Sequence, residues 1–189
     1  RGRSGWGVLS VILWVLFGLF SLTGLLASIF ICFSYGDREH FEAPRVFGPE
    51  SSPKEIAIVY HPGGSALPEN IVTLISEKLA QKGIKVTLYT ANTQLNIDPR
   101  KFAAIGLASP VYGGTVRPPL TGFIQRTDLA GAKCFAVITG WYKSPEVVKV
   151  KELIESKGGI YMDGRKFTGA DLKNPVEIES FIDSIMDTL

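Results

Sequence analysis

Cysteine and histidine are scarce in this 189-residue chain, which has only two of each. Cys32 lies inside a long apolar stretch and Cys134 lies in a predicted strand, so neither belongs to a Cys-x-x-Cys pair or to a Cys/His cluster. Disulfide frameworks, iron–sulfur sites and zinc sites need more such residues at closer spacing. We therefore expect no metal site and interpret both cysteines as small apolar residues.

Residue patterns for side-chain catalysis are also missing. The two histidines, His40 and His61, do not complete a specific Ser/His/Asp or Cys/His arrangement. The glycines at Gly63 and Gly64 lack the lysine and the spacing of a Walker phosphate loop. If the protein performs chemistry, a bound cofactor must supply it.

An excess of charge of one sign is absent as well. The chain has 20 Lys and Arg against 18 Asp and Glu, a formal net charge of +2, and lysine and glutamate alternate along the predicted helices. This pattern gives no reason to expect a nucleic-acid partner. With 46% hydrophobic residues, the chain is long enough to bury the core of one domain.

The longest stretch without charge lies between Arg3 and Asp37, and residues 6–33 are dominated by Leu, Val, Ile and Phe. At about 1.5 Å per residue, a helix of this length exceeds the ~30 Å hydrocarbon core, so one tilted span fits. The alternatives are a core helix or a cleaved signal, whose apolar region is typically ~7–15 residues. We predict a retained single-pass anchor over residues 1–35.

The anchor's orientation and surroundings are left open by the sequence. Two arginines precede it and two follow it within a short distance, so the positive-inside count is tied. Its small residues, such as Gly18 and Gly24, permit packing on another transmembrane helix but are also common in spans. Residues 36–53 are rich in charge, Pro, Gly and Ser without an apolar period, which predicts a juxtamembrane linker.

Residues 54–189 alternate between short apolar runs and segments of helical periodicity, which predicts a doubly wound α/β domain. The apolar runs suit a parallel sheet covered on both faces. Between the second and third runs there is little room for a covering helix. The predicted strands are 55–60, 84–89, 102–108, 133–139 and, more weakly, 159–162; the helical stripes lie in 68–79, 120–124, 146–154 and 175–189.

Ligands of such a sheet bind at the carboxyl ends of the strands where the strand order reverses. Three predicted loops converge there: 61–67, 109–116 and 140–144. The middle loop reads Ser109-Pro110-Val111-Tyr112-Gly113-Gly114-Thr115 after a buried strand. An aromatic ring followed by two glycines can cover a planar ring while the backbone approaches its edge.

This loop, the order of elements and the domain length resemble the short-chain flavodoxins and flavodoxin-like reductases. The resemblance covers residues 54–189 and implies a five-stranded parallel sheet that binds FMN noncovalently. It implies cofactor contacts from His61, Gly63, Gly64, Ser65, Ala66, Ser109, Pro110, Val111, Tyr112, Gly113, Gly114, Thr115, Thr139, Gly140, Trp141 and Tyr142. Either aromatic of the third loop serves as the second wall of a ring site or as a contact for a partner protein.

The first loop departs from the family pattern. The family usually has hydroxyl residues around the FMN phosphate, whereas here only Ser65 carries one. A glycine-rich turn before a helix still offers N–H donors and a favourable dipole. We expect His61 to compensate by donating to the phosphate, unless the loop is only a tight turn that no longer binds phosphate.

Together these features predict a membrane-anchored electron carrier or flavin-dependent reductase with a membrane redox protein or complex as its partner. Its domain is expected on the cytoplasmic side, where FMN and its reductants are found. The alternative is a flavin-free flavodoxin fold that serves as an accessory subunit of a membrane complex. The altered first loop and the weakly basic composition favour this alternative.

Overall fold

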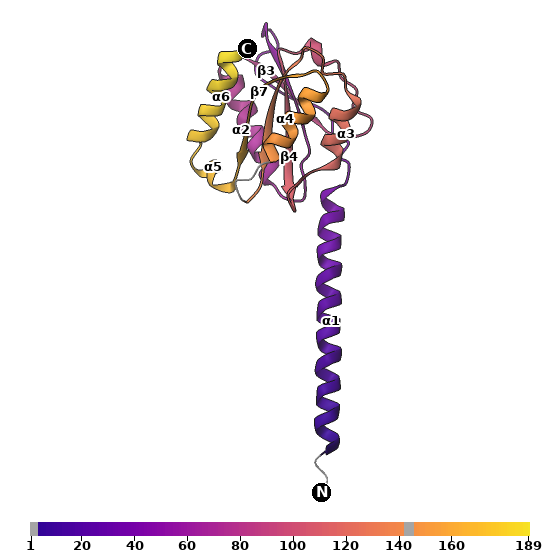
Figure 1. Ribbon diagram of the computed structural model, residues 1–189. Helices are drawn as coiled ribbons and strands as arrows, with labels where there is room; N and C mark the ends of the chain where they lie inside the picture. Colours follow the sequence, from indigo (N-terminus) through magenta and orange to yellow (C-terminus); the bar gives the residue numbers. More distant parts are fainter. Residues whose placement is uncertain (1–3, 142–145) are drawn as a thin grey trace. The chain divides into compact units, whose positions relative to one another are not determined.

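The computed structural model describes residues 4–141 and 146–189 (Figure 1). The chain forms two compact units, residues 1–35 and residues 36–189. The first unit contains helix α1 (Ser4–Gly36). In the described part of the chain, only the segment Leu9–Ile29 of α1 is long and apolar enough to cross a bilayer, with a mean hydropathy of 2.3. A signal sequence meets the same criteria of length and composition.

The second unit is built on a parallel sheet, as predicted. Its parallel strands lie in the order β3-β2-β4-β6-β7, so the strand order reverses between β2 and β4. Four of these strands are buried over most of their length because helices cover both faces of the sheet. Their bounds are β2 (Glu55–Tyr60), β3 (Lys85–Thr90), β4 (Ala104–Tyr112), β6 (Lys133–Thr139) and β7 (Ile160–Phe167).

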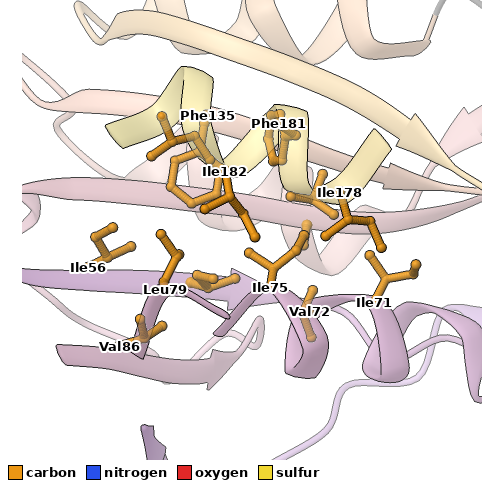
Figure 2. Close-up of a cluster of buried hydrophobic side chains, with 14 of the residues drawn as sticks. Ile56, Ile71, Val72, Ile75, Leu79, Val86, Phe135, Ile178, Phe181 and Ile182 are labelled. Atoms are coloured by element: carbon orange, nitrogen blue, oxygen red, sulfur yellow. The ribbon is translucent and has the colours of Figure 1, made fainter. Parts of the chain in front are cut away.

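Helices cover the two faces of this sheet in pairs, and each pair encloses its own hydrophobic core (Figure 1). On one face, Ile75 and Leu79 pack with Ile182 and Phe181 above the strands (Figure 2). These side chains are the apolar stripes that predicted the helices. The first pair is α2 (Leu67–Gln81) and α6 (Val176–Thr188), preceded by the short α5 (Gly169–Lys173); the second is α3 (Pro118–Arg126) and α4 (Glu146–Ser156).

The connection between β3 and β4 contains only the 3₁₀ turn η1 (Pro99–Lys101). The prediction that no full covering helix fits there is therefore confirmed. The N-terminal turn of η1 is held by Asp98, whose carboxylate accepts from the backbone N–H of Arg100 at 3.1 Å.

The linker predicted for residues 36–53 is wrong, because these residues belong to the compact unit that begins at Gly36. Strand β1 (Arg45–Phe47) pairs antiparallel with β3 and so covers the outer edge of the sheet. Upstream of β1, the His40 carbonyl accepts from Asn92 at 3.0 Å and the Glu39 carboxylate accepts from Thr93 at 3.0 and 2.8 Å. These polar contacts require no apolar period, so they could not be predicted from the sequence.

Gly106 in β4 permits a close approach between the sheet and an aromatic ring. A Cβ at this position would lie 2.6 Å from the ring of Phe135 and 2.9 Å from Ile58 Cγ1. Phe135 is fully buried and packs edge-on against Phe181. The ring therefore has little space into which it can retreat.

We predict that Gly106→Ala destabilises the domain by about 1–3 kcal/mol because it overpacks the core. The measurement is urea unfolding of the full-length protein in detergent, followed by far-ultraviolet circular dichroism. The matched control is Gly122→Ala in α3, whose Cβ would meet only Arg126 Nη1 at 3.7 Å. This control should be neutral or slightly stabilising, since Ala favours helix by about 1 kcal/mol over Gly. Equal midpoints for the two variants would contradict the prediction.

Candidate functional site

The first loop follows β2 and begins with a fully buried histidine, His61. Its Nδ1 accepts from the backbone N–H of Gly63 at 2.9 Å, so the proton lies on Nε2, which donates to the Arg38 carbonyl at 3.1 Å. Burial, which the Arg117 charge reinforces, lowers the pKa of His61 to about 4. The ring is therefore neutral at pH 7 with both nitrogens occupied. The expectation that His61 donates to a phosphate disagrees with this arrangement.

The rest of the first loop leads into the N-terminus of α2. Gly63 has a φ of +69°, which glycine adopts without strain. Ala66 is the N-cap residue and gives the helix no side-chain cap. Within the described part of the chain, the backbone N–H groups of Ala66 and Leu67 have no hydrogen-bond partner. This helix end therefore keeps unsatisfied donors and a positive dipole.

The second loop is a β-hairpin. Strand β4 continues to Tyr112, turns through Gly113 and Gly114 with φ values of +59° and +74°, and returns as β5 (Thr115–Val116). The turn needs both glycines because L side chains rarely adopt such φ values. The sequence signal Tyr-Gly-Gly thus identified a real turn at the carboxyl edge.

Tyr112 joins the second loop to the first. Its hydroxyl accepts from the backbone N–H of Gly64 at 2.9 Å, and a Cβ on Gly63 would lie only 2.8 Å from that hydroxyl. Ser109, in contrast, serves the loop itself: its buried hydroxyl accepts from the Arg117 N–H at 3.1 Å. Two backbone N–H groups of the first loop, those of Gly63 and Gly64, therefore already donate to side chains of this protein, His61 and Tyr112.

The third loop follows β6 at Thr139, whose hydroxyl is buried without a hydrogen-bond partner among the described residues. Trp141 is 88% exposed, and Tyr142 lies outside the described residues. An open groove of about 450 Å³ lies between this loop and the first turn of α2. It is lined by Leu67, Asn70, Gly140, Trp141, Thr168, Gly169 and Leu172.

Beside these loops lie two buried charged groups that the sequence analysis did not single out. Arg117, the residue before α3, is 4% exposed and forms a salt bridge with Asp37, while its Nε and Nη1 have no partner among the described residues. Glu146 and Lys166 form a buried pair at 3.0 Å. A Cβ on Gly140 would lie 3.3 Å from Lys166 Nζ, so this pair lies directly beneath the third loop.

The sequence contains only weak signals that Arg117 and Lys166 lie at the site. Arg117 lies two residues after the loop sequence Ser109–Thr115, and a single arginine at such a place is typical of a surface charge. Lys166 was not assigned to a strand, because β7 extends to Phe167 and is longer than predicted. Only the pairing of Ile138 with Lys166 shows that this lysine lies at the carboxyl edge.

Chemically, the three loops offer backbone N–H donors, a buried guanidinium and aromatic side chains at the carboxyl edge, and the groove lies beside the third loop and the first turn of α2. This combination can hold a ligand with an anionic end and a planar apolar part. Among the described residues, no side chain in it is placed as a nucleophile. Cys134, the one cysteine with a described side chain, is a buried residue of β6, and burial raises the pKa of its thiol to about 12. It packs as the small apolar residue that we expected.

The fold is flavodoxin-like. Flavodoxin 1 from Bacillus cereus superposes with a TM-score of 0.60 at 13% identity, covering 72% of this chain and 99% of the flavodoxin. Flavodoxin 2 from the same organism gives 0.58 at 20% identity, covering 71% and 99%. General stress protein 14 from Treponema denticola, solved in complex with FMN, gives 0.51 at 12% identity, covering 72% and 99%. No protein-family model and no curated protein matches the sequence.

The buried neutral state of His61 predicts a pH dependence of stability. Its folded pKa of about 4 lies below the ordinary value of 6.5, so the unfolded chain binds the additional proton between these two values. Stability should therefore fall as the pH falls from 6.5 to 4, by about 1.4 kcal/mol per pH unit from this group. Urea unfolding at several pH values should show this component in the wild type and not in His61→Gln. An imidazole NMR titration near pH 6.5 for His61 would contradict the prediction.

Proposed function

We propose that the protein binds FMN noncovalently at the carboxyl edge of its sheet and carries electrons. The observation that supports this most directly is the convergence of three loops at the strand-order reversal, beside a helix end with unsatisfied N–H donors. In sheets of this type ligands bind at that edge. The groove of about 450 Å³ has the size of a small-molecule site.

The residues present fit this cofactor. The free N–H groups at Ala66 and Leu67 are suited to a phosphate. The exposed ring of Trp141 and the Gly113-Gly114 turn are suited to the flavin ring. Thr139, the last residue of β6, is paired with Pro110 at the same edge. When bound, the flavin itself supplies one- or two-electron transfer, and the protein binds, orients and shields it.

We further propose that α1 retains the protein in a membrane, with the domain on the cytoplasmic side and a membrane redox protein or complex as partner. The exposed apolar side chains of Leu9–Ile29 support an anchor of single-pass type. An anchor would raise the effective concentration of the carrier near a membrane partner. A flavin-dependent reductase acting on a small molecule is a variant of the same proposal.

A second candidate function is a flavin-free accessory subunit. It is favoured by two hydrogen bonds within the protein that occupy donors of the first loop. His61 Nδ1 accepts from Gly63 N–H, and the Tyr112 hydroxyl accepts from Gly64 N–H. A phosphate in this loop loses these donors unless the two side chains move. In this candidate function, exposed Trp141 contacts a partner protein instead of a flavin.

Purification of the full-length protein in detergent distinguishes the two candidates. We expect a yellow protein that releases about one FMN per chain on denaturation, or a colourless protein that takes up FMN to this ratio. The flavin is measured by its absorbance after release. A protein that stays colourless after incubation with FMN would support the accessory subunit and exclude the carrier.

The ring site has its own test. Trp141→Ala should weaken FMN binding about tenfold, because an aromatic contact contributes ~0.5–1.5 kcal/mol beyond its buried area. The dissociation constant is measured by flavin fluorescence. The matched control is Val148→Ala on α4, an exposed apolar residue whose loss should leave FMN affinity unchanged. Equal affinities for wild type and Trp141→Ala would reject Trp141 as a wall of the site.

The anchor is tested in membranes. After expression of the natural chain, alkaline carbonate should leave the protein in the membrane fraction, and a variant lacking residues 1–35 should appear in the soluble fraction. In sealed inside-out vesicles, protease should remove the domain, since its cytoplasmic side then faces outward. Release of the natural chain by carbonate would contradict the anchor, and full protection in inside-out vesicles would contradict the orientation.

A further inference from the structure

We propose that Arg117 is the cation that binds the phosphate of the nucleotide, and that Asp37 is an internal anion that competes with this phosphate. This inference rests on the proposed function and extends it to residues outside the loops implied by the flavodoxin resemblance. It identifies the segment immediately after α1 as a regulator of the site's occupancy.

The starting observation is the incomplete hydrogen bonding of Arg117. The residue is 4% exposed, and among the described residues its Nη2 alone has an acceptor, the Asp37 carboxylate. Nε and Nη1 are buried without a partner among the described residues. Buried donors of a charged group without an acceptor are costly and rare in native proteins. An oxyanion with several oxygens would satisfy them, and a guanidinium is the side chain best suited to bind one.

The guanidinium lies near Tyr112 and His61, the two side chains that accept hydrogen bonds from the first loop. Its Cζ is 5.4 Å from the ring centroid of Tyr112, whose hydroxyl accepts from Gly64 N–H. Its charge also contributes to the low pKa of His61, the residue that holds Gly63 N–H. The hydroxyl of Tyr112 thus lies where an oxygen of a phosphate bound to Gly64 N–H would lie. A phosphate that replaces this hydroxyl would lie beside the ring over which the Arg117 guanidinium is placed.

Asp37 supplies the negative charge in the absence of such a ligand. Its side chain is 40% exposed, so little desolvation opposes its release to water. The neighbouring backbone is attached to the same edge of the sheet, through the Arg38 carbonyl on His61 and the His40 carbonyl on Asn92. These contacts hold the carboxylate close to Arg117. A second anion at the same guanidinium meets the repulsion of the first, so the two compete.

The test compares FMN with riboflavin, which lacks the phosphate, and also uses inorganic phosphate alone. In the full-length protein, Asp37→Asn should bind FMN about tenfold more tightly, with riboflavin affinity unchanged. Inorganic phosphate should raise the thermal unfolding midpoint more in Asp37→Asn than in the wild type. The matched control is Asp183→Asn on α6, which removes an exposed ion pair with Lys82 and should change none of these values.

Variants of Arg117 complete the test. Arg117→Gln should abolish the stabilisation by phosphate and weaken FMN about tenfold without weakening riboflavin, and Arg117→Lys should restore part of both. Equal FMN affinity and equal phosphate response in wild type and Asp37→Asn would overturn the proposed competition, as would equal changes for FMN and riboflavin. If neither flavin binds but phosphate still stabilises the protein through Arg117, the FMN proposal fails and the anion site stands.

Discussion

The parallel pairing of β2, β3, β4, β6 and β7 is the constraint on which the candidate site depends. Parallel strands need crossover connections, so every loop that leaves a carboxyl end is placed on the same edge. Burial of both faces removes the strands themselves from contact with ligands. At the carboxyl edge, the polar backbone that the described residues present to a ligand therefore lies in these loops. The order reversal between β2 and β4 separates the loops enough to leave a site.

Within that edge, the function depends on which groups satisfy the N–H donors of the first loop. His61 Nδ1 and the Tyr112 hydroxyl take two donors, while those of Ala66 and Leu67 have no partner among the described residues. A backbone N–H without an acceptor is costly when buried, and His61 supplies an acceptor to the half-buried N–H of Gly63. Internal acceptors stabilise the empty loop and thereby weaken any ligand that requires the same donors. A neutral histidine serves this purpose because its pKa is about 4.

The strands, the helical stripes and the three loops could be predicted because each is a local pattern. Alternating apolar runs define the strands, and Tyr112-Gly113-Gly114 specifies a turn by φ alone. Three features of the site could not be predicted, because each depends on a residue distant in sequence. They are the neutral state of His61, the salt bridge of Arg117 and the Glu146–Lys166 pair. The attachment of residues 36–53 to the domain was not predicted for the same reason. It depends on polar hydrogen bonds and one short edge strand, which produce no apolar periodicity in the sequence.

The competition proposed for Arg117 connects the site to the segment that follows α1 through thermodynamic linkage. If the Asp37 carboxylate lowers the affinity for a phosphate by some factor, the bound phosphate lowers the affinity of the domain for the Asp37 segment by the same factor. The remaining contacts at the Arg38 and His40 carbonyls decide whether the segment then stays attached. His61 takes part in both equilibria, since one ring nitrogen holds the loop and the other holds the segment. One neutral imidazole thus couples occupancy of the nucleotide site to attachment of the segment after α1.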